Sequence, residues 1–293
     1  MKSGFAAVVG RPNVGKSTLV NRMVGKKVSI TSTRPQTTRN TIRGVVHGDG
    51  YQIVLVDTPG LHKPRTELGN RLNSLVHGTL READVVVFVI DATMEIGPGD
   101  RLVAERLHDA GSDVVVAVNK VDIARREQVV SQLAEAGEWG FADYYPLSAE
   151  TGQGVSDLVE GLVSRLPEGP AYYPEDMITD LPEATVVAEI IREKFLDRLR
   201  EELPHSLVVR VDEVEERGDG LLAITADVIV ERDSQKGMVI GKGGSLLGAA
   251  GTEARLELEA LLGARIHLDL HVVVEKDWQR RPVLLDRLGF EEP

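Results

Sequence analysis

Hydrophobic residues follow one pattern in the first part of the chain and another in the last part. In residues 1–170, short apolar runs alternate with helix-length segments of mixed polarity. The runs read FAAVV, YQIVLV, DVVVFVI, DVVVAV and YYPLS. Near-continuous Val and Ile runs between helices are typical of a parallel sheet covered on both faces. The pattern predicts an α/β domain over residues 1–170, with a mostly parallel sheet and helices on both faces.

The last part of the chain changes to shorter, alternating elements. Residues 185–202 repeat their apolar positions every three or four residues, which predicts a helix. Residues 207–211 and 221–230 alternate as strands do, and EERGDG between them is a hairpin turn signal. A second helical stripe and a last alternating run, residues 266–274, follow. The stripe consists of Leu247, Ala250, Ala254, Leu258 and Leu261. We therefore expect a small α+β domain over residues 185–293.

Between these domains lies a segment that reads as a linker. The stretch LPEGPAYYPEDMITDLPEA, residues 166–184, contains four prolines, which argues against regular structure. Within it, residues 171–184 carry four acidic and no basic side chains. A chain of 293 residues is long enough for a core on either side of such a linker.

Composition narrows the classes of function. The net charge is −12, and residues 185–293 carry 15 Lys and Arg against 22 Asp and Glu, or −7. Such a domain does not attract nucleic acid as a whole, so RNA binding there must be local. The absence of cysteine excludes disulfides and cysteine nucleophiles and fits a reducing cytoplasm. Since no apolar run approaches 18 residues, we expect no transmembrane segment. The N-terminus runs straight into the strand-like FAAVVG, so we expect no signal peptide.

The stretch GRPNVGKS, residues 10–17, carries the first chemical signal. It follows the run FAAVV and opens a helix, the context in which G-x-x-x-x-G-K-[ST] binds phosphate. Gly10 and Gly15 let backbone N–H groups approach phosphate oxygens, and the helix N-terminus favours negative charge. Lys16 is expected to reach the β- and γ-phosphates, and Ser17 to bind Mg²⁺. The other residues assigned here to nucleotide binding are Arg11, Pro12, Asn13, Val14 and Thr18.

A second signal, DTPG, ends the run YQIVLV. Asp57 is placed to hold Mg²⁺ through water, and the Gly60 N–H to contact the γ-phosphate. Thr58, Pro59 and Leu61 complete the expected contacts. Because a leucine side chain cannot orient water, we expect slow intrinsic hydrolysis. On its own, Asp-Thr-Pro-Gly would more often be a simple turn.

Two further motifs choose the base. In NKVD, residues 119–122, the Asp122 carboxylate can accept hydrogen bonds from N1–H and the 2-amino group of guanine. Adenine lacks that donor pair, and a site built for such bonds discriminates strongly. Asn119 braces the loop, Lys120 lies over the nucleotide, and Val121 completes the motif. Ser148 and Ala149 follow the last run, where the Ala149 N–H can read guanine O6. All four motifs end strands, at the edge where open α/β sheets bind ligands.

The polar segment TSTRPQTTRN, residues 31–40, is expected to order with GTP and supply a second hydroxyl to Mg²⁺. Thr38 is the candidate and Thr37 its rival; a plain exposed loop is the alternative. The metal ligands are therefore expected to be Ser17, Thr38 and Asp57, and the catalytic residues Lys16, Thr38 and Gly60.

These motifs resemble a known family. GRPNVGKS, QTTRN, DTPGL, NKVD and SAE in this spacing are similar to the TrmE–Era–EngA group of bacterial ribosome-associated GTPases. KGMVIGKGG, GTEAR and VEKDW…LGF resemble the Era type in particular. The resemblance implies a P-loop GTPase domain followed by a type II KH domain. It further implies binding to the 3′ end of 16S ribosomal RNA and help in small-subunit maturation, with GTP hydrolysis timing release.

The resemblance extends to location and ions. It implies a cytoplasmic protein with peripheral association with the inner face of the cell membrane, and we expect a monomer. Asn13 matches the asparagine with which related GTPases hold potassium near the phosphates. As a hypothesis, potassium then joins Mg²⁺ as a cofactor and compensates for Leu61.

KH domains clamp single-stranded RNA through a GxxG loop, and GKGG fits that loop. The expected RNA contacts are Ile240, Gly241, Lys242, Gly243 and Gly244. This is not a second nucleotide site, because the P-loop spacing and a hydroxyl directly after the lysine are missing. A helix-initiating glycine turn is the plain alternative. Residues 245–248 read SLLG where Era proteins usually carry basic residues, so phosphate anchoring is expected to be weaker.

Two other functions are alternatives to RNA binding gated by GTP. A regulatory switch could act through protein partners alone, with the second domain as an adaptor; RNA crosslinking to residues 241–244 would separate it from an RNA clamp. A tRNA-modifying GTPase is disfavoured because those relatives end in a cysteine motif and this chain has no cysteine.

Overall fold

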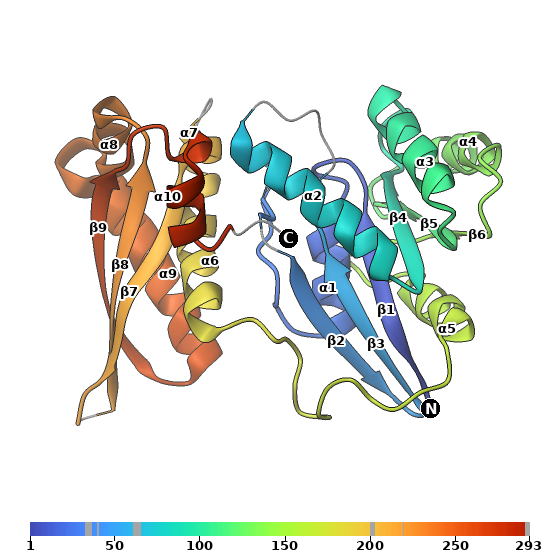
Figure 1. Ribbon diagram of the computed structural model, residues 1–293, viewed down its shortest axis with the longest axis horizontal. Helices are drawn as coiled ribbons and strands as arrows, with labels where there is room; N and C mark the ends of the chain where they lie inside the picture. The colour runs from blue at the N-terminus through green and yellow to red at the C-terminus, as the bar shows by residue number, and fades with distance from the viewer. Residues whose placement is uncertain (33–36, 40, 61–65, 200–202, 219, 291–293) are drawn as a thin grey trace.

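Two β-sheets, each packed against its own helices, organise the chain (Figure 1). The structure is a computed structural model. It describes residues 1–32, 37–39, 41–60, 66–199, 203–218 and 220–290. The first sheet has the strand order β2-β3-β1-β4-β5-β6, and the second has the order β7-β8-β9.

The elements of the first domain are β1 (Lys2–Val9), α1 (Lys16–Val24), β2 (Ile42–Gly48), β3 (Tyr51–Asp57), α2 (Glu67–Glu82), β4 (Val85–Asp91), α3 (Pro98–Ala110), β5 (Val114–Asn119), α4 (Arg126–Gly137), β6 (Asp143–Pro146) and α5 (Val155–Arg165). Those of the second domain are α6 (Glu183–Leu196), α7 (Leu203–Ser206), β7 (Val208–Glu216), β8 (Leu221–Val230), α8 (Asp233–Ile240), η1 (Lys242–Gly244), α9 (Ser245–Leu262), β9 (Arg265–Val274), η2 (Trp278–Arg280) and α10 (Pro282–Arg287).

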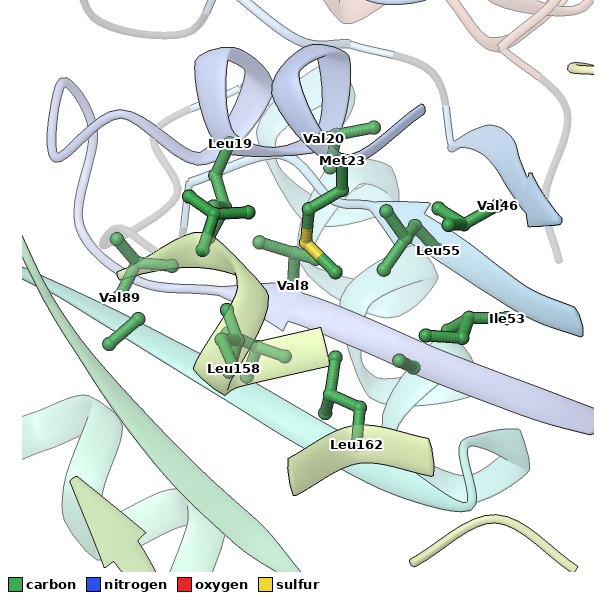
Figure 2. Packing of buried hydrophobic residues seen from close by; sticks show 14 of the residues in the cluster. Val8, Leu19, Val20, Met23, Val46, Ile53, Leu55, Val89, Leu158 and Leu162 are labelled. Carbon is green, nitrogen blue, oxygen red and sulfur yellow. The ribbon is translucent and has the colours of Figure 1, made fainter. Parts of the chain in front are cut away.

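The first sheet is buried on both faces, as its apolar runs predict. Val8 of β1 packs with Leu19 of α1 and Leu158 of α5 on one face, shown in Figure 2. Its neighbours Ala7 and Val9 point to the opposite face, where α2, α3 and α4 cover the sheet. Every strand pair is parallel except β2 with β3. The predicted fold class of this domain is confirmed, and its parallel strands end at one shared edge.

Strand β2 was not anticipated from the sequence. Its residues read IRGVVHG, where glycine and histidine interrupt the apolar run that marks the other strands. The strand lies at the edge of the sheet, antiparallel to β3. Its outer side meets the linker: the Val45 N–H donates to the Ile178 carbonyl at 2.8 Å, and Gly44 forms a bridge with Thr179. The proline-rich segment is thus docked along the sheet (Figure 1).

The second domain is an α+β unit, as predicted. β8 pairs antiparallel with β7 and parallel with β9. Helices α6, α8 and α9 cover one face of this sheet. Helix α6 runs over Glu183–Leu196, so it begins two residues before the predicted range 185–202, and residues 200–202 lie outside the described part. Helix α8 was not predicted; it ends at Ile240, directly before GKGG.

The two domains share a buried contact on the other face of the second sheet. Leu68 and Leu72 of α2 pack with Trp278 and Leu285 of the C-terminal segment. Beside them, Arg71 Nη1 donates to Asp286 at 2.6 Å. Figure 1 shows α2 and α10 facing each other across this contact.

Among the helices described here, none is long and apolar enough to cross a membrane.

Candidate functional site

The loop of residues 10–15 connects β1 to α1, at the edge where the parallel strands end, and Lys16 and Ser17 are the first two residues of α1. Gly15 caps α1 with φ +98°, and a Cβ atom there would lie 2.2 Å from Asn119 Nδ2. Only glycine fits that position. The first N–H groups of an α-helix have no partner within the helix. They are therefore available to an anion at the start of α1.

Lys16 is almost fully buried beneath this loop. Its Nζ donates to the carbonyl oxygens of Gly10 at 3.2 Å and Arg11 at 2.9 Å. Burial lowers the pKa of Lys16 to about 8, although the charge of Asp57 acts to raise it. A buried ammonium group held by neutral carbonyls gains strongly from a nearby anion such as a phosphate.

Three of the expected metal ligands meet in one cluster. Ser17 Oγ donates to Asp57 Oδ2 at 2.7 Å and lies 3.0 Å from Thr38 Oγ1. Thr38 donates to the same carboxylate oxygen at 3.2 Å. Ser29, which sequence reasoning missed, donates to it at 2.7 Å. Thr37 and Thr38 both line the neighbouring cleft, and Thr38 bonds to the Asp57 carboxylate in the cluster.

The environment of Asp57 shows whether this cluster suits Mg²⁺. Its side chain is fully buried, and its Oδ1 has no hydrogen-bond partner within the described residues. Burial raises the pKa of Asp57, while hydrogen bonds from Ser29, Ser17 and Thr38 and the charge of Lys16 act against that rise. An unpaired carboxylate oxygen beside two hydroxyls is the hard oxygen environment that Mg²⁺ prefers. The residues present therefore fit the ion.

A cleft of about 450 Å³ opens over the loop and the cluster, within the range of about 300–1,000 Å³ typical of small-molecule sites. It is lined by Pro12, Asn13, Gly15, Lys16, Ser17, Thr18, Thr31, Ser32, Thr37, Thr38, Gly60, Lys120 and Asp197. Asp197 comes from the end of α6 in the second domain, and no sequence pattern singled it out. Leu61 lies outside the described residues.

The base-selecting motifs are joined to the phosphate loop through Asn119. Its Nδ2 donates to the Val14 carbonyl at 2.8 Å, and its Oδ1 accepts the Ala149 N–H at 2.9 Å. The N–H expected to read guanine O6 is thus bonded to Asn119 in this structure. Lys120 Nζ donates to the Asn13 carbonyl at 2.9 Å and to Asp91 at 2.6 Å. Neither Asp91 nor its role as a brace for Lys120 was anticipated.

Several residues that were predicted to contact the nucleotide make hydrogen bonds within the protein or are buried in it. Arg11 Nε donates to buried Asp100 of α3 at 2.6 Å, which turns its guanidinium toward that helix. Thr58 donates to the Val8 carbonyl at 2.9 Å. Pro59 and Ser148 are buried, and the Val121 N–H donates to the Leu147 carbonyl at 3.3 Å. Asp122 is exposed at the end of its loop.

The GKGG loop connects α8 to α9. Gly241 has φ +74°, and a Cβ atom there would lie 2.9 Å from the Leu246 nitrogen. Gly243 and Gly244 also have positive φ, and Lys242 is exposed. Ile240, expected in the RNA contact, is the last residue of α8, and its half-buried side chain packs against the core of the second domain.

Beside this loop, a groove of about 340 Å³ runs between α9 and β9. It is lined by Gly244, Leu247, Gly248, Gly251, Thr252, Arg255, Leu268 and Leu270. Sequence reasoning missed this surface; the signal was the helical spacing of Gly244, Gly248 and Gly251, which leaves gaps between the side chains on this side of α9. The groove is apolar along its floor, and it carries the guanidinium of Arg255, which bonds both Glu259 oxygens at 3.0 Å.

Comparisons with known proteins agree with this geometry. Residues 5–120 match a family described as a 50S ribosome-binding GTPase, and residues 202–279 match the KH domain. The proteins called GTPase Era from Mycobacterium tuberculosis (strain ATCC 25618 / H37Rv) and Mycobacterium bovis (strain BCG / Pasteur 1173P2) are each 54% identical over 295 residues, covering 98% of both chains.

Two solved structures are similar over nearly the whole length. One is an Aquifex aeolicus Era variant bound to GDP·AlF4⁻, with TM-score 0.95 and 39% identity, covering 99% of this chain and 100% of the other. The second is Era in complex with MgGDPNP and nucleotides 1506–1542 of 16S ribosomal RNA, with the same TM-score and identity, covering 99% of each chain. The chain therefore belongs to the Era family of GTPases.

Proposed function

We propose that this chain binds and hydrolyses GTP in its first domain and binds the 3′ end of 16S ribosomal RNA with its second, assisting maturation of the small ribosomal subunit. One observation carries the proposal: the cluster of Ser17, Thr38 and Asp57 and a GKGG loop beside a groove occur in one chain. The relative solved with MgGDPNP and nucleotides 1506–1542 of 16S ribosomal RNA supports it.

In the first domain, different residues bind different parts of the nucleotide. Lys16 pairs with the β- and γ-phosphates, the Gly60 N–H meets the γ-phosphate, and Asp122 accepts from the guanine base. Ser17, Thr38 and Asp57 would hold Mg²⁺. When bound, the ion neutralises the charge that develops on the phosphates. Lys16, Thr38 and Gly60 are the residues to which we assign catalytic roles.

Hydrolysis is proposed to be slow without a stimulating partner. The side chain of Leu61, which follows Gly60, has no hydrogen-bonding atom with which to orient water. A potassium ion near Asn13 would place a positive charge beside the phosphates and so compensate for Leu61. Asn13 lines the cleft and has φ +66°. Hydrolysis should then be faster in potassium chloride than in sodium chloride of the same ionic strength. Equal rates would remove potassium from the proposal.

In the second domain, we propose that the RNA backbone passes the GKGG loop and that bases enter the groove. Lys242 supplies one exposed cation, and the start of α9 offers backbone N–H groups to phosphate. The apolar floor between α9 and β9 suits an unstacked base, with Arg255 beside it. Since the domain is acidic as a whole, contact is expected at this surface alone.

Location and assembly rest on the family alone. We propose a cytoplasmic monomer with peripheral association with the inner face of the cell membrane. Flotation with vesicles of acidic phospholipid tests the association, and light scattering tests the monomer.

The deciding experiment measures affinity for a short single-stranded RNA that copies the 3′ end of 16S ribosomal RNA. The native chain is compared with Lys242→Asp/Gly243→Asp, each loaded with GDP or GDPNP. We expect the double variant to lose at least about tenfold in affinity, since two carboxylates would face phosphate. Lys26→Asp, at an exposed lysine of the first domain, controls for the Lys→Asp part of the charge change, which is −2 of the −3 in the double variant.

If the double variant binds RNA as tightly as the native chain, GKGG is only a turn. The chain would then act through protein partners, with its second domain as an adaptor. A native affinity that also differs between GDP and GDPNP would mark RNA binding as gated by the nucleotide.

A further inference from the structure

The carboxylate of Asp197 stands in the wall of the nucleotide cleft, although it belongs to the second domain. Asp197 is the C-cap of α6 and is exposed to the cleft side. One of its oxygens accepts a hydrogen bond from Ser32 Oγ at 2.8 Å. In the described part of the chain, no residue donates to its other oxygen. An acceptor in this wall is therefore available to a ligand.

Helix α6 is fixed against the first domain, so the position of Asp197 is defined. Glu193 Oε1 accepts the Thr31 N–H at 2.8 Å, and its Oε2 lies 2.5 Å from Lys27 Nζ. The residue directly before Glu193, Arg192, donates from its buried guanidinium to the Thr37 carbonyl. These bonds hold α6 along the segment that also supplies Thr31 and Ser32 to the cleft.

The chemistry of a guanine nucleotide limits what this carboxylate can bind. The phosphate oxygens and the ribose ring oxygen only accept hydrogen bonds. The base donates through N1–H and its 2-amino group, which the proposed function assigns to Asp122. The remaining donors are the 2′- and 3′-hydroxyl groups of the ribose. A carboxylate beside phosphate would be repelled instead, and the phosphate end already has Lys16 and the start of α1.

We propose that Asp197 accepts a hydrogen bond from a ribose hydroxyl of the bound guanine nucleotide. A carboxylate on a ribose 2′-hydroxyl is a known solution in dinucleotide-binding folds. The inference rests on the proposed function and adds one feature to it. The nucleotide is then held by both domains at once, with its base and phosphates in the first and its sugar in the second.

The test compares the affinities of GDP, 2′-deoxy-GDP and 3′-deoxy-GDP for the native chain, Asp197→Asn and Asp197→Ala, by titration calorimetry with Mg²⁺ present. The native chain should bind GDP roughly three- to tenfold more tightly than at least one deoxy analogue, as for a hydrogen bond to a partly exposed charged group. In Asp197→Ala that ratio should fall to about one. Asp197→Asn, which keeps one acceptor oxygen, should lie between them.

The ratio between ribose and deoxyribose isolates the sugar contact from any general effect of charge. Asp180→Ala is the matched control: it removes a carboxylate of the linker, paired with Arg43 at 2.9 Å, that does not line the cleft. Its ribose preference should equal that of the native chain. The inference is overturned if the native chain shows no ribose preference, if Asp197→Ala keeps it, or if Asp180→Ala loses it equally. A native chain that binds no guanine nucleotide would instead reject the proposed function itself.

Discussion

The chain contains two glycine- and lysine-rich loops, each followed directly by a helix, and they differ in burial. In residues 10–17 the lysine is 6% exposed and bonded to two backbone carbonyls. In residues 241–244 the lysine is exposed at the surface. The first loop leaves a buried strand, and the second joins two helices.

This difference matches the shapes of the two ligands. A loop at the floor of a 450 Å³ cleft suits one compact, highly charged molecule. A loop on the surface beside a groove suits a polymer that enters and leaves along its length. Under the proposed function, similar sequence chemistry serves two kinds of phosphate, and the burial of each loop distinguishes them.

The two lysines provide the strongest contrast. Lys16→Met should lower GTP hydrolysis by roughly 100- to 1,000-fold, because a buried donor aimed at developing charge is lost. Lys242→Met should leave hydrolysis unchanged. Single-turnover rates with purified protein would measure both. Similar losses in the two variants would abolish the distinction.

Two glycines of the second loop both have positive φ, but only one of them is crowded by neighbouring atoms, so alanine substitutions can separate backbone strain from steric crowding. Gly241→Ala combines a positive φ with a Cβ atom only 2.9 Å from the Leu246 nitrogen, and should cost about 2–4 kcal/mol of unfolding free energy. At Gly243, a Cβ atom meets nothing within 4 Å, so Gly243→Ala should cost about 1 kcal/mol. Urea unfolding can be followed through Trp278 in a Trp139→Phe background, since the chain has two tryptophans. Equal costs would contradict the crowding at Gly241.

Next to the first loop, the hydroxyl of Thr38 lies in the predicted metal cluster, and the RNA contact predicted for the second loop includes no such hydroxyl. Thr38→Ala should reduce GTP hydrolysis at least about tenfold and abolish GDPNP-dependent ordering of residues 31–40. Affinity for GDP should stay within about twofold. Hydrogen exchange of this segment and calorimetry would check these outcomes, with Thr37→Ala as the milder control. Unchanged ordering in Thr38→Ala would remove Thr38 from the metal site.

An ion cluster links the helices that follow the two loops. Lys27, beyond α1, lies 2.5 Å from Glu257 of α9, which also pairs with Lys194. Partial burial acts to raise the pKa of Glu257, but its hydrogen bonds to Lys194 and Lys27 outweigh this and hold the pKa below its usual 4.5. A carboxyl whose pKa is lowered by folding stabilises above its unfolded pKa and loses that contribution as pH falls through the folded pKa.

Glu257→Gln should therefore cost about 0.5–1 kcal/mol of unfolding free energy at pH 7, since the pair is partly exposed. The difference from the native chain should shrink below pH 4.5. Urea titrations at several pH values would measure it, and a difference independent of pH would exclude this ion cluster as its source.

The smallest effect concerns salt. One exposed lysine should contribute about 0.7 to the slope of log affinity against log salt for single-stranded RNA. Lys242→Gln should lower that slope by this amount, measured by RNA titrations between low and physiological salt. A larger change would indicate that the loop organises other cations.

The sequence anticipated the features with local signatures. Runs such as DVVVFVI predicted buried parallel strands, and the four nucleotide motifs fell at strand ends because parallel strands share one edge. Strand β2 was not predicted because Gly44 and His47 interrupt its apolar run. Helix α8 was not predicted because GKGG, which directly follows it, reads as a glycine turn.

Long-range partners left no local trace. Ser29 reaches Asp57, and Asp197 reaches Ser32 from 165 residues away. Such contacts depend on how elements pack, and no spacing of residue types encodes them. The Ala149 N–H is likewise bonded to Asn119, whose orientation only the fold determines.

The docked linker has a consequence for solubility. An edge strand presents unpaired backbone groups that can recruit another chain and start aggregation. Here the Val45 N–H is already occupied by the linker carbonyl of Ile178. A fragment that stops at residue 170 would leave the backbone groups of this edge unpaired and should self-associate more readily. The acidic, proline-rich linker therefore protects the edge of the sheet from pairing with another chain.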